Sequence, residues 1–459
     1  MKPFFLCLCT LLFSASLLQA QQEDSAMIRK IANEILVNGK AYSMLSTLTK
    51  TVGGRLSGSP QMVKAEKWGQ QALEASGADR VYLQECMVPH WVRGGREEAR
   101  LIGTGGKADE KLDILALGNS VGTGPAGITA PVILINSFEE LEKRKQEVKG
   151  KIVFYNYRFN PRFIQTFRAY GDAVRYREFG ASLAAKYGAL AMMTSSMTES
   201  VDNNPHTGAL DYMDSFPKIP AAALGLWDAN KLAASLSGGH EIKMYLKTLA
   251  ATLPDTTGHN VIGELTGSEF PDQYITVGGH LDSWDPAEGA SDDGTGCVHS
   301  IEVLRALKAI GYKPKHTIRV VLFANEENGL RGGTKYGEQA KANHEKHLFG
   351  LESDAGGFTP RGFSISLPPE KLERIRQNWI PLLKEYGVYE FMQGGGGADV
   401  SPLNELLGTP VSELMPDSQR YFDLHHSRAD VLENVNKREL ELGAINMAAL
   451  IYLVDKYGF

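Results

Sequence analysis

From Tyr274 to the end of the chain, short apolar runs alternate with segments of helical periodicity. Residues 274–279 and 317–324 are rich in β-branched and other apolar side chains, which favours buried strands, and residues 298–310 carry apolar side chains at helical spacing. Further elements are expected at 348–351 (a strand) and at 371–386 and 437–457 (helices). Strands separated by helices predict an α/β fold, with a mostly parallel mixed sheet sandwiched by helices. Ligands bind such sheets at the carboxyl ends of the strands.

Five short patches rich in His, Asp and Glu come just after predicted strands. They are residues 279–285, 289–296, 323–330, 352–357 and 424–430. A single His-x-Asp or Glu-Glu pair is most often a solvated surface feature, whereas five patches at the mouth of one sheet indicate a shared site. Neutral imidazoles and carboxylates are good ligands for zinc. The set therefore predicts a metal site built from His and carboxylates.

Two of these patches suit a metal centre in detail. Asp282 stands two residues after His280, and side chains at i and i+2 of a strand face the same way, so Asp282 can orient the imidazole. Asp292 and Asp293 are adjacent in a Gly-flanked turn, where two negative charges are costly unless a cation compensates them. One carboxylate with two oxygens can bridge two metals about 3.5–4 Å apart.

A third patch suits proton transfer. Glu326 and Glu327 directly follow the strand at 317–324. Adjacent side chains diverge, so one glutamate can bind a metal while the other faces an attacking water. Such a glutamate can accept the proton of the water and pass it to the leaving group.

In combination, the patches resemble the co-catalytic dizinc exopeptidase family of the bacterial leucyl aminopeptidase and carboxypeptidase Q type. The family pattern has His-x-Asp, a Gly-Ala-x-Asp-Asp-x-x-Gly turn, Glu-Glu after a strand, a further Asp and a late His. All five occur in this order between Gly279 and Asp430. Residues 280–285, 352–356 and 425–427 look most like the carboxypeptidase Q type. The resemblance implies the zinc exopeptidase fold.

The resemblance also implies a role for each matching residue. The implied metal ligands are His280, Asp292, Glu327, Asp354 and His426. His280 and Asp354 would hold one zinc, Glu327 and His426 the other, and Asp292 would bridge both. Glu326 would be the general base and acid, and Asp282 the partner of His280. The peptide bond between Asp292 and Asp293 is cis in relatives.

The choice between two neighbouring histidines follows the family pattern as well. The family ligand is followed by Ser or Thr and, four residues on, by Asp, which His426 satisfies and His425 does not. His425 is expected to line the substrate pocket. Gly396 and Asp399 lie in a glycine-rich stretch that relatives carry near the pocket, and a plain connection between helix and strand is an equal alternative.

The middle of the chain has another character. Residues 115–250 begin with a Gly-rich stretch and continue with short apolar strands, and their motifs resemble the protease-associated domain that several such peptidases contain. We expect this segment to be inserted into a catalytic domain formed by residues 21–114 and 251–459. Two domains in series are the alternative, but the first 110 residues look too incomplete to fold alone.

The N-terminus and the charge bear on location and partners. Residues 1–20 combine an early Lys, a short apolar run and a small final residue, which is typical of a signal peptide, so we expect a secreted or periplasmic protein. No later stretch is apolar enough for a membrane span. The net charge of −6, without basic blocks, argues against a nucleic-acid partner. The resemblance suggests a homodimer.

The resulting functional hypothesis is a zinc-dependent exopeptidase with two Zn²⁺ ions, which hydrolyses dipeptides or short peptides through a metal-activated water. An aminopeptidase that releases N-terminal residues is the close alternative. A non-hydrolytic binding or receptor relative is a second alternative, which the intact ligand set disfavours. A glutaminyl cyclase-like acyltransferase is a third, and it typically uses one zinc.

Overall fold

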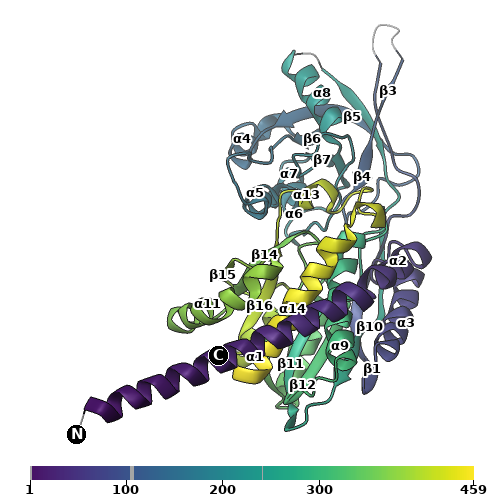
Figure 1. The fold of residues 1–459 in the computed structure, drawn as a ribbon. Coiled ribbons are helices and arrows are strands. Elements are labelled where there is room, and N and C mark those ends of the chain that lie inside the picture. Colours follow the sequence, from purple (N-terminus) through teal and green to yellow (C-terminus); the bar gives the residue numbers. More distant parts are fainter. Residues whose placement is uncertain (1–2, 104–107, 240) are drawn as a thin grey trace.

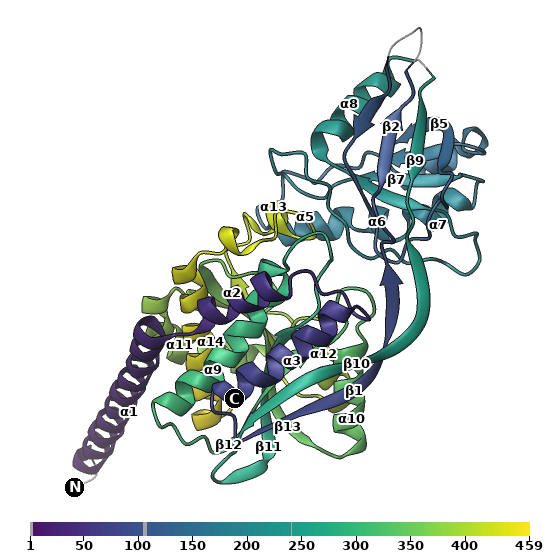
Figure 2. The same ribbon diagram turned by 90° about the vertical axis from the view of Figure 1, so that its right-hand side faces the viewer.

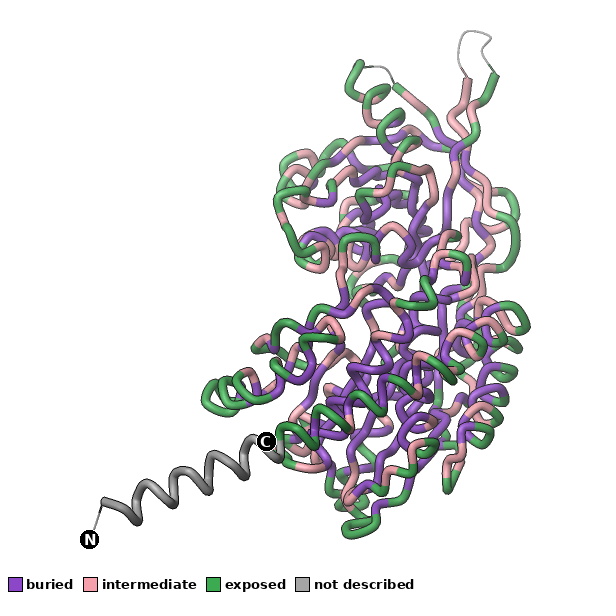
Figure 3. Tube along the Cα trace, viewed as in Figure 1, coloured by how far each residue is buried: buried purple, intermediate pink, exposed green. Residues whose placement is uncertain are grey.

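Two sheets organise the molecule, each with eight strands (Figures 1 and 2). The computed structural model describes residues 3–103, 108–239 and 241–459, and of residues 3–20 it describes the backbone alone. The first sheet lies in the lower part of Figure 1 and the second in the upper part. Buried residues gather inside both parts (Figure 3). We call the part built on the second sheet, residues 98–247, the second-sheet unit, and the remainder the first-sheet unit.

The first sheet is mixed, and its central strands are parallel. In sheet order its strands are β1 (Arg80–Val92), β10 (Ala251–Leu265), β12 (His316–Phe323), β11 (Phe270–His280), β13 (Lys346–Glu352), β16 (Val411–Pro416), β14 (Pro360–Ile365) and β15 (Glu390–Gln393). Strands β12, β11, β13 and β16 pair in parallel, and antiparallel pairings flank them. The carboxyl ends of the parallel strands therefore meet at one edge, which faces the second-sheet unit.

Helices cover both faces of the first sheet, because successive side chains of a strand point to opposite faces. Val320 and Leu322 of β12 enter one apolar core, while Val321 and Phe323 enter another. The larger core is completed by α1 (Pro3–Asn38), α2 (Ala41–Thr51), α3 (Pro60–Ala75), α9 (Thr295–Ala309), α11 (Pro369–Leu383) and α14 (Lys437–Tyr457). The smaller core is completed by α10 (Arg331–Ala342) and α12 (Ser401–Leu407). The predicted α/β fold with a helix-covered mixed sheet is confirmed.

The second sheet has a similar build on a smaller scale. In sheet order its strands are β3 (Glu110–Leu112), β2 (Glu98–Leu101), β9 (Lys243–Lys247), β5 (Ile128–Ile135), β6 (Ile152–Tyr155), β7 (Ala191–Ser195), β8 (Ala221–Leu224) and β4 (Ile114–Ala116). Its helices are α4 (Phe138–Lys143), α5 (Thr166–Ala173), α6 (Arg175–Glu178), α7 (Gly180–Ala185) and α8 (Leu226–Ser237). Strands β2 and β3 precede residue 115, the start expected from the sequence, because these short, charged strands carry no apolar run.

Two long antiparallel strands connect the units. The chain leaves the first sheet along β1 and returns along β10, and the pair continues from one unit toward the other (Figure 2). A small apolar cluster of Leu56, Trp91, Ala250 and Trp284 fills the junction. Short helix α13 (Tyr421–Leu424) follows the first sheet but packs its aromatic side chains on the second-sheet unit.

The N-terminal predictions stay open. The expected signal peptide, residues 1–20, has its first two residues outside the described residues, and the backbone of its remainder begins helix α1. In the part of the chain that the structure describes, none of the helices has the length and apolar composition needed to cross a membrane. Cys86 and Cys297 are buried free thiols.

Candidate metal centre and catalytic site

The carboxyl ends of three neighbouring parallel strands position most of the predicted site. His280 is the last residue of β11, Glu326 and Glu327 follow β12, and Asp354 follows β13. Because β12 and β13 both pair in parallel with β11, these side chains emerge at one edge. Asp292 joins them from the turn that precedes α9. Patches that are far apart in the sequence are therefore neighbours at one edge of the first sheet.

Asp292 lies at the centre of the cluster, between two imidazoles. Its Oδ1 is 3.2 Å from Nε2 of His280, and its Oδ2 is 3.2 Å from Nε2 of His426. Asp354 Oδ1 lies 3.3 Å from the same Nε2 of His280, and Glu327 Oε2 lies 3.1 Å from Nε2 of His426. The structure thereby groups the five predicted ligands as two sets that share Asp292.

Both imidazoles present a lone pair to these carboxylates. Nδ1 of His280 lies 3.0 Å from the carbonyl oxygen of Asp282, and Nδ1 of His426 lies 3.3 Å from that of Thr207. A carbonyl only accepts hydrogen bonds, so Nδ1 carries the proton in each neutral ring and Nε2 is left as an acceptor. In the neutral rings these acceptor nitrogens meet only carboxylate oxygens, an arrangement that a metal cation between them would satisfy.

The burial of the cluster makes this requirement stronger. His280 Nε2, Asp292 Oδ2 and Asp354 Oδ1 are buried polar atoms without a hydrogen-bond partner among the described residues. Burial raises the pKa of Asp354 above its usual range, and burial together with the charge of Asp292 raises the pKa of Glu327 to about 7. Crowded carboxylates that resist ionisation indicate a missing positive charge. Nitrogen and oxygen donors of this kind fit zinc.

Glu326 stands beside the cluster without joining either set. Its Oε2 is 4.0 Å from Nε2 of His280, and its backbone N–H donates to Oδ1 of Asp282 at 3.0 Å. Burial raises the pKa of Glu326 well above its usual range, and the charges of Asp354 and Glu327 act in the same direction. A carboxyl group that is poised to exchange a proton beside the metal ligands suits general acid–base chemistry.

Two further carboxylates, Asp293 and Asp430, accept hydrogen bonds from the backbone of the segments that carry the proposed ligands. Asp293 accepts hydrogen bonds from the backbone N–H groups of His280 (3.0 Å) and Gly296 (2.8 Å). Asp430 accepts from the N–H groups of Ser291 (2.6 Å) and Asp292 (3.2 Å). The Asp292–Asp293 peptide bond is cis, in agreement with the resemblance.

Of the two neighbouring histidines, His426 reaches both Asp292 and Glu327. The Nε2 of His425 is 3.8 Å from Asp292 Oδ2, and the two rings are stacked with centroids 3.5 Å apart. His426 has a φ of 59°, a left-handed conformation that is uncommon for a residue with a side chain. Such conformations persist where the surrounding structure enforces them, often at functional sites.

Sequence reasoning missed Arg55, which is fully buried below the site. Its guanidinium donates to the carbonyl oxygens of Leu281 (2.5 Å), Glu288 (2.8 Å) and Gly289 (3.0 Å). These three bonds fix the connection between His280 and Asp292. No local pattern marks this arginine, because it lies in a loop more than two hundred residues earlier in the chain.

A cavity of about 610 Å³ opens onto the cluster between the two units. Asp292, Glu326, Glu327, Asp354 and both histidines 425 and 426 line it on one side. The second-sheet unit supplies the other side with Asn119, Phe167, Tyr170, Arg177, Glu178, Phe179, Ala209, Leu210 and Asp211. His425 therefore lines the cavity as predicted. Gly396 and Asp399 are not among its lining residues, and the backbone N–H of Asp399 contacts Glu352 instead.

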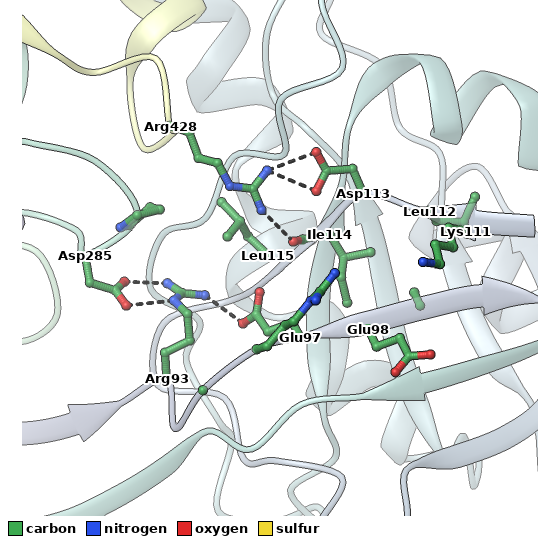
Figure 4. A pocket seen from close by; sticks show the side chains of 14 residues that line it. Arg93, Glu97, Glu98, Lys111, Leu112, Asp113, Ile114, Leu115, Asp285 and Arg428 are labelled. Atoms are coloured by element: carbon green, nitrogen blue, oxygen red, sulfur yellow. Dashed lines mark hydrogen bonds and ion pairs between the residues drawn. The ribbon is translucent and has the colours of Figure 1, made fainter.

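A second cavity, of about 630 Å³, lies at the junction of the units (Figure 4). Its charged side chains form ion pairs: Arg93 with Asp285 (2.6 Å) within the first-sheet unit, and Arg428 with Asp113 (2.9 Å) across the junction. Arg93 also pairs with Glu97. The pairs made by Asp285 and Arg428 tie the loop that follows His280 and the loop that carries His426 to residues beside strands β1 and β4.

Comparison with known proteins agrees with this geometry. Residues 260–451 match the model of peptidase family M28. Carboxypeptidase Q of Homo sapiens is 38% identical over 440 residues, which cover 94% of this chain and 90% of the relative. Carboxypeptidase Q of Bos taurus is 37% identical over 443 residues, 95% of this chain and 91% of the relative.

Solved structures extend the likeness to the whole fold. A peptidase M28 precursor from Shewanella amazonensis SB2B superposes with a TM-score of 0.89 at 31% identity, covering 95% of this chain and 97% of that one. The aminopeptidase from Aneurinibacillus sp. strain AM-1 superposes with a TM-score of 0.64 at 21% identity, covering 93% and 95%. The second likeness concerns the fold alone. The resemblance seen in the sequence is confirmed, and the chain belongs to peptidase family M28.

Proposed function

We propose that this protein is a zinc-dependent exopeptidase that hydrolyses dipeptides or short peptides. The observation that carries the proposal is Asp292, a buried carboxylate placed 3.2 Å from the acceptor nitrogens of two imidazoles. Two protonated imidazoles would not balance the carboxylates gathered there, whereas divalent cations would. The similarity to carboxypeptidase Q over nearly the whole chain supports the substrate class.

The finer proposal concerns two zinc ions. His280 and Asp354 would hold one, Glu327 and His426 the other, and Asp292 both. When bound, the zinc ions supply Lewis acidity toward the substrate carbonyl and toward water. The carbonyl groups of Thr207 and Asp282 keep the two imidazoles oriented for this binding.

The chain itself supplies the proton transfers. Glu326 accepts a proton from the attacking water as the water adds to the scissile carbonyl. The same carboxyl then donates this proton to the nitrogen of the departing amine, so the C–N bond breaks without release of an amide anion. Asp282 holds Glu326 in place through the backbone bond at 3.0 Å. Aromatic side chains from both units, Phe167, Tyr170, Tyr421 and Phe422, line the cavity beside these groups.

The adjacent glutamates provide the test. Glu326→Gln should keep the zinc content of wild type, measured by mass spectrometry, and lower kcat about 1,000-fold on free dipeptides. Glu327→Gln, its matched control, should lower the zinc content as well as the rate. Full activity of Glu326→Gln would contradict its role as the acid–base residue. Loss of zinc without loss of activity in either variant would contradict the need for zinc in catalysis.

The substrate panel distinguishes the alternatives. Free, C-terminally amidated and N-acetylated dipeptides are offered to the zinc-loaded protein. Cleavage that requires a free C-terminus supports the carboxypeptidase interpretation, whereas cleavage that tolerates the amide but requires a free amine assigns an aminopeptidase. No cleavage of any member with zinc bound overturns the short-peptide proposal, in favour of a binding relative or an acyltransferase.

The remaining parts of the proposal concern organisation and location. The second-sheet unit is a protease-associated-type domain inserted into a split catalytic domain, a division supported by the departure of the chain along β1 and its return along β10. Residues 1–20 direct export and are then removed, which N-terminal sequencing of the secreted protein tests. Association as a homodimer stays a prediction that analytical ultracentrifugation can check.

A further inference from the structure

The cavity at the metal ligands contains one unusual cation. Arg177, in the short helix α6, is the only arginine or lysine that lines the cavity among the residues that the structure describes. It is 8% exposed. It comes from the second-sheet unit, while the carboxylate ligands face it from the first-sheet unit.

The hydrogen bonds of Arg177 leave its charge uncompensated. Its Nε donates to the carbonyl oxygen of Ala209 at 3.1 Å, and its Nη1 donates to the hydroxyl of Tyr170 at 2.7 Å. Over the described part of the chain, no carboxylate comes within ion-pair distance of the guanidinium. A buried charge is costly unless an opposite charge accompanies it. The arrangement therefore lacks an anion.

The position of Arg177 limits which part of a substrate can supply that anion. Gly208 separates the guanidinium from the imidazole of His426: a Cβ on this glycine would be 2.5 Å from Nη1 of Arg177 and 2.6 Å from Nδ1 of His426. The arginine thus lies next to a metal-ligating side chain. One residue of extended chain spans only about 3.5 Å. A group that reaches Arg177 from the scissile bond therefore belongs to a residue directly beside that bond, and of the main-chain groups there only the C-terminal carboxylate of the following residue is an anion.

We propose that Arg177 binds the C-terminal carboxylate of the substrate and so sets the enzyme to release one C-terminal residue. This inference rests on the proposed function and specifies which end of the peptide substrate the enzyme recognises. A guanidinium is suited to the task, because its planar fork matches the two oxygens of a carboxylate. Phe167, Tyr170 and Phe422 pack on one another in the wall beside Arg177, and the attraction between opposite charges is stronger next to such apolar surface than in bulk water.

The experiment compares free dipeptides with the same dipeptides amidated at the C-terminus. Wild type is expected to favour the free form in kcat/KM, and Arg177→Gln should lower kcat/KM for the free form about 100-fold, mainly through KM, while the amide changes less than about threefold. Arg177→Lys keeps the charge without the fork and should recover part of the loss. Arg175→Gln, which changes an exposed arginine on the same helix, is the matched control and should leave both substrates unchanged.

A second readout covers ligands that are not turned over. Free leucine and leucinamide are titrated as competitive inhibitors, and Arg177→Gln should weaken inhibition by leucine alone. Equal losses for free and amidated ligands would show that Arg177 only supports the fold, and would overturn the inference. Equal kcat/KM of wild type for free and amidated dipeptides would also overturn the inference, but the proposed exopeptidase activity would remain. Failure of wild type to cleave any peptide would instead refute the proposed function.

Discussion

The two sheets have the same number of strands and similar helix cover, yet they contribute differently to the cavity between them. The first-sheet unit supplies every proposed metal ligand and the proposed acid–base residue, most of them held at the ends of parallel strands. The second-sheet unit supplies aromatic walls, a backbone bond to His426 and the cation Arg177. The groups proposed for catalysis and the group proposed for substrate selection thus lie on separate units. Mutations in the first-sheet unit should therefore affect all substrates, whereas mutation of Arg177 should affect mainly substrates with a free C-terminus.

The largest expected effect comes from the residue shared by the two ligand sets. Asp292→Asn should lower kcat/KM at least about 1,000-fold for every substrate and should lower the zinc content, because a neutral amide is a poorer metal ligand than a carboxylate and would weaken both ligand sets. Asp228→Asn in the second-sheet unit, where Asp228 accepts a bond from the N–H of Asp113, is the control. Mass spectrometry and kinetics are the measurements. If Asp292→Asn kept the zinc content of wild type, Asp292 would not be a metal ligand, and the assignment of metal binding to the first-sheet unit would be contradicted.

The next effect tests whether Arg55 supports the ligand loops. Arg55→Met removes the side-chain donor that serves three carbonyl oxygens and should lower the free energy of unfolding by about 3 kcal/mol, with reduced activity on all substrates alike. Urea denaturation followed by circular dichroism measures the change. Arg100→Met, which removes an arginine of the second-sheet unit whose ion pairs lie at the surface, should change the free energy of unfolding far less. Equal losses in the two variants would contradict the role of Arg55.

A smaller effect is expected from the glycine between Arg177 and His426. Gly208→Ala places a methyl group close to both side chains, 2.5 Å and 2.6 Å from their nearest nitrogens, and should lower kcat/KM about 10-fold to 100-fold by displacing them. Gly150→Ala is the control, because Gly150 also has a positive φ but no atom within 4 Å of the added Cβ. Wild-type kinetics in Gly208→Ala would show that the two units are less tightly coupled than their contact suggests.

The smallest effect concerns the ion pairs at the junction (Figure 4). Arg428→Ala removes an exposed pair with Asp113 and should lower the free energy of unfolding by less than about 1 kcal/mol, with kcat/KM within about threefold of wild type. Differential scanning calorimetry measures the change in stability, and the comparison of low with high salt shows how much of it comes from the ion pair, because salt screens exposed charges. A loss comparable to that of Arg55→Met would mean that this pair, and not the packed junction, holds the units together.

The sequence predicted the chemical side of the cavity well. The strands and helices expected after Tyr274 lie close to those observed, and the closing helix spans the predicted residues 437–457. Apolar periodicity is a local signal, and parallel strands bring their carboxyl ends to one edge without further information. The grouping of His280, Glu326 and Asp354 at one edge of the sheet therefore follows from local patterns alone.

The other side of the cavity could not be predicted in the same way. Arg55 acts through bonds to residues more than two hundred positions later, and Arg177 meets the metal ligands only in the folded chain. Nothing in the local sequence distinguishes either arginine from a surface arginine. Strands β2 and β3 are short and charged, so their pairing depends on partners elsewhere in the chain. For Asp399 the glycine-rich stretch left pocket lining and a plain connection as equal alternatives, and the structure places its backbone N–H on Glu352, outside the lining of the cavity.

The bond between Thr207 and His426 has a consequence for how the protein is made. His426 is the last of the proposed ligands to be synthesised, and its Nδ1 partner belongs to a unit completed about two hundred residues earlier. Domains generally fold as units, N-terminal first, while the chain leaves the ribosome. The second-sheet unit can therefore be complete when His426 arrives and serve as the surface on which the final ligand is set. The ligand set that contains His426 would therefore be completed only after the second-sheet unit has formed.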